Sequence, residues 1–299
     1  IIKINIAQYG DKKILLSNST QLSYSELDDY SEKISLFLKN SGLTDCEFVG
    51  VLGLNSPEFV AISFGIWKAG GVLIPFNYSL KPEEIIAIFK KTKLRYLFIE
   101  NKFLGIEQFR VTIYQSISNV IIIDNKSNLK ADNIANSDIN NRVIITRFSE
   151  IIAKPIDKNR AGNIEISGAT TALCIFTSGT TGVPKGVMLT HNNLLANIES
   201  MRHALKFQEN KDIVLNILPM FHVFSFTCGI LLELYQSAPV YIIEKFAPKL
   251  TLETIEREKI TIILAVPVML KLLILTQAKE HFDTSSLAVV ISGGAALDS

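Results

Sequence analysis

The stretch Thr177-Ser178-Gly179-Thr180-Thr181-Gly182-Val183-Pro184-Lys185-Gly186 decides which fold this chain is expected to adopt. It holds three glycines, four hydroxyl side chains and one lysine, and the apolar residues 173–176 lead into it. Glycines let backbone N–H groups approach a ligand closely, while the hydroxyl groups and Lys185 add hydrogen-bond donors and a positive charge. The pattern predicts a buried strand that ends in a loop suited to a polyphosphate.

Two familiar phosphate loops do not fit this stretch. A Walker A loop needs Gly-Lys-Ser/Thr at the start of a helix, whereas here Pro184 precedes Lys185 and Gly186 follows it. A dinucleotide fingerprint needs Gly-x-Gly-x-x-Gly, which Gly179-Thr180-Thr181-Gly182 does not supply. A flexible linker is the remaining alternative, but the apolar segments on both sides favour an ordered loop between strands.

Composition indicates a globular chain. Its 299 residues allow one large or two ordinary domains, and 48% of them are apolar while 20% are charged. The formal net charge of +1 gives no reason to expect binding to nucleic acid or to an anionic membrane. Cys46, Cys174 and Cys228 lack the spacing of a disulfide framework or a zinc site, which favours a reducing compartment.

Neither a secretory signal nor a transmembrane segment is expected. Lys3 and the charged residues 11–13 interrupt the apolar character of the first residues. The longest apolar run, residues 260–275, contains Pro267 and Lys271, so we expect a buried strand followed by a helix rather than a membrane span. A soluble cytoplasmic enzyme is the class that these features favour.

Strand and helix signals alternate along the chain. Ser23 and Glu26 form a capping box at the start of a helix that Gly42 ends, and Thr190 is expected to cap another helix. Strands are predicted at residues 48–54, 72–76, 94–99, 120–124, 143–148, 172–176, 187–189, 213–218, 240–243, 261–266 and 287–292. Further helices are predicted up to residue 68, from residue 82, and at 224–235, 252–259 and 268–278. This alternation predicts an α/β fold with mostly parallel sheets covered by helices, and the polar residues 125–142 are expected to form an exposed loop.

Two glycine-rich segments follow predicted strands, one after Phe176 and one after Ile291. Ligands of open α/β sheets bind at the carboxyl ends of the strands. We therefore expect one crevice with two walls, of which the first suits phosphates and the second allows a flat ring to approach the backbone.

The central stretch closely resembles the phosphate-binding signature of the adenylate-forming superfamily, which includes acyl-CoA synthetases, luciferases and adenylation domains. Four further segments resemble family motifs in the same order. These are Leu22-Ser23-Tyr24-Ser25-Glu26-Leu27, Trp67-Lys68-Ala69-Gly70-Gly71-Val72-Leu73-Ile74-Pro75-Phe76-Asn77, Pro219-Met220-Phe221-His222-Val223-Phe224 and Ser292-Gly293-Gly294-Ala295-Ala296-Leu297. The resemblance thus spans nearly the whole chain and implies an acyl-CoA synthetase/luciferase-like N-terminal domain, with two αβ subdomains in αβαβα layers.

The resemblance also implies residue boundaries for the domain and its two subdomains. Residues 1–299 would form a truncated AMP-binding N-terminal domain, with subdomain one at roughly 55–205 and subdomain two at roughly 1–54 plus 206–299. Relatives continue with a Tyr-Gly-x-Thr-Glu segment, an Asp that binds ribose, and a C-terminal domain with a catalytic Lys. None of these follows Ser299, so full catalysis by the 299 residues alone is not expected.

The implied reaction is the attack of a carboxylate on the α-phosphorus of ATP, which gives an acyl-adenylate and pyrophosphate, followed by thioester formation with CoA. Because negative charge grows on the leaving group, catalysis needs donors and a cation at that place. The resemblance assigns catalytic roles to Lys185 and His222 and a magnesium contact to Thr177. It assigns nucleotide binding to Thr177, Ser178, Gly179, Thr180, Thr181, Gly182, Lys185, Gly293, Gly294 and Ala295. A solvated surface lysine and a structural histidine are the plain alternatives for Lys185 and His222.

The sequence says less about which acid is activated and which molecule accepts the acyl group. Amino-acid-activating relatives place an Asp just after the Phe of the Phe-His segment, and residues 221–226 contain no acid. An aliphatic or aryl acid is therefore expected, and a fatty acid fits best, given the nearby Phe224, Phe226, Ile230 and Leu231. Packing in the core is the plain alternative for these apolar residues. Two alternatives stay open: an acyl-AMP ligase that loads a carrier protein, and a nucleotide-binding module without turnover.

Overall fold

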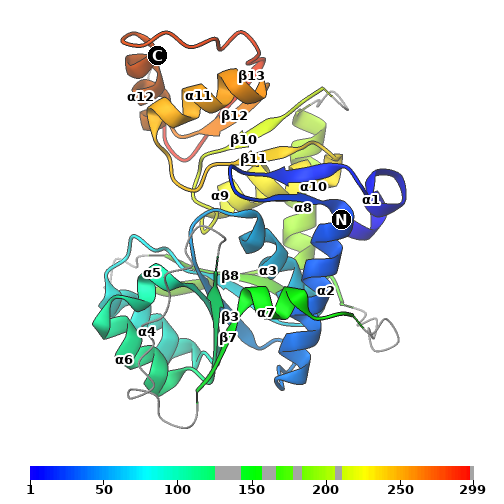
Figure 1. Ribbon diagram of the computed structural model, residues 1–299, viewed down its shortest axis with the longest axis vertical. Coiled ribbons are helices and arrows are strands. Elements are labelled where there is room, and N and C mark those ends of the chain that lie inside the picture. The colour runs from blue at the N-terminus through cyan, green and yellow to red at the C-terminus, as the bar shows by residue number, and fades with distance from the viewer. Residues whose placement is uncertain (125–142, 157–165, 178–183, 206–210, 297–299) are drawn as a thin grey trace. The chain divides into compact units, whose positions relative to one another are not determined.

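The computed structural model describes residues 1–124, 143–156, 166–177, 184–205 and 211–296, and the chain divides into two compact units. We call Ile1–Asp28, Asn55–Pro57 and Leu194–Ser299 unit 1, and Asp29–Leu54 and Glu58–Asn193 unit 2 (Figure 1). The limits expected from sequence placed residues 29–54 in the other subdomain. They lie in unit 2 because strand β3 (Phe48–Leu52) pairs with two strands of that unit, and a sequence does not reveal strand pairing.

Unit 2 is built on a seven-stranded sheet. In spatial order its strands are β7 (Ile144–Arg147), β6 (Asn119–Ile123), β5 (Tyr96–Glu100), β3, β4 (Val72–Pro75), β8 (Thr171–Thr177) and β9 (Lys185–Thr190). Neighbouring strands are parallel except for β8 and β9, which are antiparallel. The predicted α/β class with mostly parallel pairing is confirmed, and the strands consist of continuous apolar runs because both faces of the sheet are covered.

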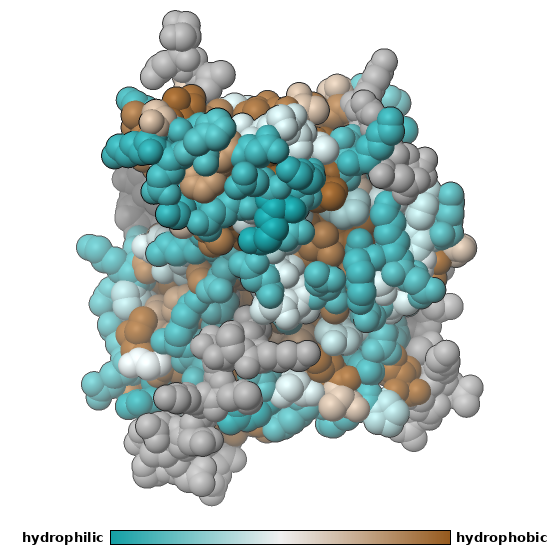
Figure 2. Space-filling view, turned by 45° about the horizontal axis from the view of Figure 1, so that its top comes forward, coloured by the Kyte–Doolittle hydropathy of each residue, from teal (hydrophilic) through white to brown (hydrophobic). Residues whose placement is uncertain are grey.

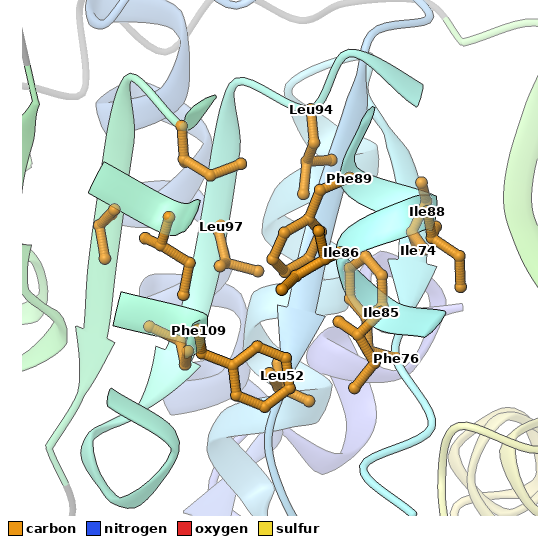
Figure 3. Close-up of a cluster of buried hydrophobic side chains, with 14 of the residues drawn as sticks. Leu52, Ile74, Phe76, Ile85, Ile86, Ile88, Phe89, Leu94, Leu97 and Phe109 are labelled. Atoms are coloured by element: carbon orange, nitrogen blue, oxygen red, sulfur yellow. The ribbon is translucent and has the colours of Figure 1, made fainter. Parts of the chain in front are cut away.

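Helices α4 (Pro82–Thr92) and α6 (Glu107–Ser116) cover one face of this sheet (Figure 1). Successive side chains of a strand point to opposite faces, so Leu52, Ile74 and Phe76 lie on the same side. They pack with side chains of α4 such as Phe89 and with Phe109 of α6 in one buried cluster (Figure 3). The Phe76 and Phe89 rings meet edge to face, with centroids 5.0 Å apart.

Helices α2 (Tyr24–Asn40) and α3 (Pro57–Lys68) also pack in unit 2. Trp67 on α3 donates from Nε1 to the carbonyl oxygen of Ala172 in β8 at 2.7 Å. A Cβ on Gly65 would lie 2.5 Å from a methyl carbon of Ile34 on α2. Only glycine therefore allows α2 and α3 to come this close, and both helices bury apolar side chains in the core.

The capping signals read from the sequence are confirmed. Ser23 N–H donates to Glu26 Oε2 at 2.7 Å, and Glu26 N–H donates to Ser23 Oγ at 3.2 Å. Thr190 and Asn193 form the equivalent reciprocal pair at the start of α8 (His191–Ala204). Gly42, just beyond the end of α2, has a φ of 82°, which an L-residue rarely adopts.

Unit 1 is built on a six-stranded sheet. In spatial order its strands are β13 (Val289–Ser292), β12 (Ile262–Ala265), β10 (Val214–Asn216), β11 (Val240–Ile242), β1 (Lys13–Leu16) and β2 (Gln21–Ser23). All neighbours are parallel except for the antiparallel pair of β1 and β2. The strands β10 to β13 therefore end at the same edge of the sheet.

Two buried clusters lie on the faces of this sheet. Helices α11 (Pro248–Glu258) and α12 (Pro267–Gln277) contribute to one of them, through residues such as Ile255 and Leu273. The other cluster includes Cys228 and Leu264, with Met201 of α8 packed against it. The helix predicted at 224–235 forms three successive pieces, namely α9 (Val223–Phe226), a π-helical turn η2 (Thr227–Leu231) and α10 (Leu232–Gln236).

Several short elements were not predicted from the sequence. They are α1 (Ile2–Tyr9), β1, β2, α5 (Asn101–Leu104), α6 and α7 (Phe148–Ala153). Their short apolar patterns do not separate helix from strand or loop. The loop expected at 125–142 lies outside the described residues. Within the described part of the chain no helix is both long and apolar enough to cross a membrane, and the face in Figure 2 carries hydrophobic side chains scattered among hydrophilic ones.

Candidate functional site

The hairpin of β8 and β9 carries the ends of the glycine-rich stretch. Thr177 is the last residue of β8 and Lys185 the first of β9, and the two residues face each other in the antiparallel register. Both are exposed. The predicted nucleotide-binding residues Ser178, Gly179, Thr180, Thr181 and Gly182 lie outside the described residues.

The direction of β8 explains why this hairpin is placed for a ligand. β8 runs parallel to β4, so Thr177 lies at the carboxyl edge of the parallel strands. The glycine-rich stretch thus follows the edge at which open α/β sheets bind ligands, as expected from the sequence.

Close packing within the same hairpin explains why position 186 is a glycine. It pairs with Phe176 on β8, and a Cβ on Gly186 would lie 3.0 Å from Cys174 Sγ and 3.1 Å from Phe176 Cζ. Both neighbours lie against the glycine, and burial raises the pKa of the Cys174 thiol to about 11. A side chain at position 186 would push on this contact and displace the strand that carries Lys185.

A second lysine reaches the base of the stretch, and sequence reasoning missed it. Lys91 on α4 donates from Nζ to the carbonyl oxygen of Pro184 at 2.9 Å, and its ammonium lies 6.0 Å from the centre of the Phe176 ring. Lys91 and Lys185 therefore bring two positive charges to the point where β9 begins. No sequence signal joins Lys91 to the stretch, because the two are more than ninety residues apart.

Unit 1 carries the second group of predicted residues. Gly293 and Gly294 follow β13, and Gly294 has a φ of 80°. A Cβ on Gly293 would lie 2.9 Å from Cζ of Phe224, so the aromatic ring lies directly against the glycine backbone. Ala295 follows as an exposed residue. The structure thus brings the Gly293 turn and the segment after His222 together.

His222 lies at the N-cap of α9, at the end of a tight turn. Its N–H donates to the carbonyl oxygen of Pro219 at 3.0 Å, and its own carbonyl oxygen accepts from Phe226 N–H at 3.0 Å. The Phe221 and His222 rings have centroids 4.5 Å apart. Partial removal of the imidazole from water lowers its pKa below the usual value, so the ring is mainly neutral at pH 7.

Asn55 holds the strand ends that precede this turn, and it was not identified from the sequence. Its Nδ2 donates to the carbonyl oxygens of Leu218 at 2.9 Å and Ile243 at 3.1 Å, and its Oδ1 accepts from Met220 N–H at 2.8 Å. The side chain is buried. Asn55 therefore fixes the start of the segment that leads to His222.

The residues assigned from sequence fall into two groups. Thr177 and Lys185 lie in unit 2, while His222, Gly293, Gly294 and Ala295 lie in unit 1. That the two groups line one crevice stays a prediction. No group of three or more His, Cys, Asp or Glu side chains that could hold a metal ion occurs in the ranges that the structure describes.

The fatty-acid expectation was drawn from four residues whose positions are now defined. Phe226, Ile230 and Leu231 are each no more than 1% exposed, so they pack into the interior. Phe224 contacts Gly293 instead. The burial of Phe226, Ile230 and Leu231 favours a place in the core over a place in an acyl pocket.

Comparisons with known proteins agree with the resemblance read from the motifs. The sequence profile of the AMP-binding enzyme family matches residues 2–299. A 4-coumarate–CoA ligase of Vanilla planifolia is 27% identical over 298 residues, which cover 98% of this chain and 51% of that protein. A probable 4-coumarate–CoA ligase of Dictyostelium discoideum is 27% identical over 303 residues and is covered to 55%. The chain thus spans about half the length of the curated relatives that it matches.

Solved structures share the fold. An anthranilate CoA ligase in complex with anthranoyl-AMP superimposes with a TM-score of 0.83 at 21% identity, covering 99% of this chain and 54% of that one. The N-terminal domain of FACL13 from Mycobacterium tuberculosis, solved with an inhibitor, has a TM-score of 0.80 at 20% identity and is covered to 69%.

Proposed function

The chain belongs to the AMP-binding enzyme family, and from this premise we propose that it serves the ATP-dependent activation of a carboxylic acid to an acyl-adenylate, with release of pyrophosphate. The observation that carries the proposal is the β8–β9 hairpin, where Thr177 and Lys185 face each other at the two ends of the glycine-rich stretch. Lys91 adds a second cation at the base of the same stretch.

The positive charges at this hairpin suit a reaction in which negative charge accumulates on the leaving group. A carboxylate and a triphosphate repel each other, and the departing pyrophosphate gains negative charge. Cations held by a rigid scaffold stabilise that charge without having to reorganise during the reaction. We assign this role to Lys185, which is held by strand pairing, and we assign to Lys91 the positioning of the stretch through the Pro184 carbonyl.

Magnesium fits this proposal as a companion of the nucleotide. Mg²⁺ usually keeps several waters and binds through one or two protein oxygens plus the phosphates of its substrate. Thr177 offers one exposed hydroxyl at the mouth of the hairpin. When bound, the ion would neutralise phosphate charge, and Thr177 is the described residue that we propose as its contact.

The turn after β13 is proposed to receive the adenine. Gly293 lacks a side chain and Phe224 lies against it. Gly294 and Ala295 are exposed beside the half-buried Gly293, and a backbone with such small side chains suits the close approach of a planar ring. His222 is proposed to orient the substrate acid. It is not proposed as a general base, because a carboxylic acid is already ionised at neutral pH.

We propose an aromatic acid without an amino group as the substrate class. Residues 221–226 carry no acid that would pair with an ammonium group, and the interior packing of Phe226, Ile230 and Leu231 removes the argument for a long acyl channel. The names of the curated relatives cite coumarate. A fatty acid is the second candidate, since one solved neighbour is described as a putative long-chain-fatty-acid CoA ligase.

The acyl acceptor is proposed to be CoA, as the names of the relatives state for those proteins. A carrier-protein thiol is the alternative acceptor. A nucleotide-binding module without turnover is the alternative to an enzyme.

Pyrophosphate exchange tests the proposal directly. We expect exchange that depends on an added acid, with 4-coumarate more effective than dodecanoate and alanine ineffective. Lys185→Ala should lower the rate by about 100-fold or more, since loss of one well-placed charge-stabilising group has effects of that size. Lys90→Ala is the matched control, because Lys90 is an exposed lysine in the same unit. Nucleotide binding without exchange would leave only the binding module.

A further inference from the structure

A cavity in unit 2 lies apart from the residues assigned to the reaction. It has a volume of about 560 Å³ and is lined by one side of α2 and by residues at and beyond the end of α7. This volume is within the range of small-molecule pockets, roughly 300–1,000 Å³. Neither Thr177 nor Lys185 lines it.

The shape of α2 explains why the cavity is apolar on one side. Ile34 and Leu38 bury one stripe of the helix in the core. Phe37, three residues after Ile34, flanks this stripe, and Leu36 lies farther round the helix; both are half-buried and line the cavity. An apolar side chain such as Leu36, outside the buried stripe, is not required by packing in the core.

The opposite wall is held in place by a defined contact. Lys33 on α2 donates from Nζ to the carbonyl oxygen of Ile152 at 2.8 Å and pairs with Asp29 at 2.7 Å. This bond ties α2 to α7, which lie side by side (Figure 1). Ile151 from α7 is buried and lines the cavity. The cavity therefore lies between elements that are joined rather than between loose segments.

The charges around the cavity have one sign. Lys33, Lys39 and Lys154 line it, and none of the described lining residues is acidic. Asp29 pairs with Lys33, whereas Lys39 and Lys154 have no ion pair within the part of the chain that the structure describes. Two positive charges beside an apolar wall match a molecule with an apolar body and a single anionic head.

We propose that this cavity binds a medium-chain monocarboxylate. Its alkyl chain would lie against Leu36, Phe37 and Ile151, and its carboxylate would lie between Lys39 and Lys154. The site is separate from the one to which acid activation is assigned, and the proposal does not rest on that function.

Octanoate is the probe, and 1-octanol is its uncharged counterpart. Isoleucine methyl NMR of the protein is expected to show saturable shifts at Ile151 and Ile156 with octanoate and much weaker ones with the alcohol. The double variant Lys39→Ala/Lys154→Ala should weaken octanoate binding about 3- to 10-fold, the range for loss of exposed ion pairs. The double variant Lys90→Ala/Lys93→Ala, which removes two exposed lysines elsewhere in unit 2, should bind as the unaltered protein does.

Three results would overturn the proposal. In the first, Ile151 and Ile156 do not respond to octanoate. In the second, octanol binds equally well and the Lys39→Ala/Lys154→Ala variant binds octanoate normally, which would mean that charge is not recognised. In the third, Leu36→Asp converts a dimer to a monomer in sedimentation, which would mean that a second copy covers this face. Binding that persists in Lys185→Ala would separate this site from the proposed reaction.

Discussion

Replacing Glu233 by glutamine should stabilise the protein at neutral pH. Glu233 on α10 is 0% exposed, and neither carboxyl oxygen has a hydrogen-bond partner in the described residues. Burial raises its pKa well above the usual value, because the charged form loses its hydration. The folded protein therefore keeps this side chain protonated at a pH where the unfolded chain releases the proton.

The sign and size of the effect follow from this difference. Below the usual glutamate pKa both states are protonated, so the group adds no pH dependence. As pH rises beyond that value, each pH unit lowers the free energy of unfolding by about 1.4 kcal/mol until the folded pKa is passed. Between pH 5 and pH 7 the loss is then up to about 3 kcal/mol. Glu233→Gln keeps the shape of the side chain and removes its ionisable carboxyl group.

Urea unfolding at pH 5, 6, 7 and 8 measures this effect. We expect the variant and the unaltered protein to have similar midpoints at pH 5, and the variant to be increasingly more stable towards pH 7. Glu253→Gln is the control, because Glu253 lies half-exposed on α11 in the same unit. A stability difference that stays constant with pH, or a destabilised variant at pH 7, would refute the reasoning.

Three further predictions concern the site. Lys91→Ala should lower acid-dependent pyrophosphate exchange more than Lys90→Ala while leaving the urea midpoint unchanged, because only Lys91 contacts the Pro184 carbonyl; equal effects of the two variants would contradict its role. Asn55→Ala should lower the free energy of unfolding by about 2–4 kcal/mol, since two buried carbonyls and one N–H lose their partner; a loss below about 0.5 kcal/mol in urea, the size of an ordinary surface change, would be inconsistent with that. Gly293→Ala should weaken ATP binding in calorimetry, because the new methyl group would lie 2.9 Å from the Phe224 ring; unchanged affinity would argue against adenine at this turn.

Local signals in the sequence predicted the geometry correctly where the residues that set it lie close together in the chain. The Ser23 and Glu26 capping box formed as predicted because both partners are three residues apart. Gly42 has the left-handed φ expected of a residue that ends a helix. Strand character was also predictable, because strands of a covered parallel sheet are continuous apolar runs.

Features that depend on distant partners could not be predicted. The sheet to which β3 belongs depends on hydrogen bonds with β4 and β5, which leave no mark in its own residues. Lys91 and Asn55 were missed because each acts on a segment far away in the chain. Glu233 looks like any polar residue of an amphipathic helix, and only the packed structure shows that its side chain is fully buried.

The position of His222 depends on other residues more than on its own side chain. Two main-chain hydrogen bonds fix its backbone: His222 N–H donates to the Pro219 carbonyl, and Phe226 N–H donates to the His222 carbonyl. Ser225 Oγ shares its one hydroxyl hydrogen between the Leu218 carbonyl at 2.8 Å and Asn216 Oδ1 at 3.1 Å, which holds the same turn. A change at His222 should therefore alter the chemistry of a bound acid and leave the fold intact. A change at Ser225 should disturb both, because the buried carbonyl and amide oxygens would lose their donor.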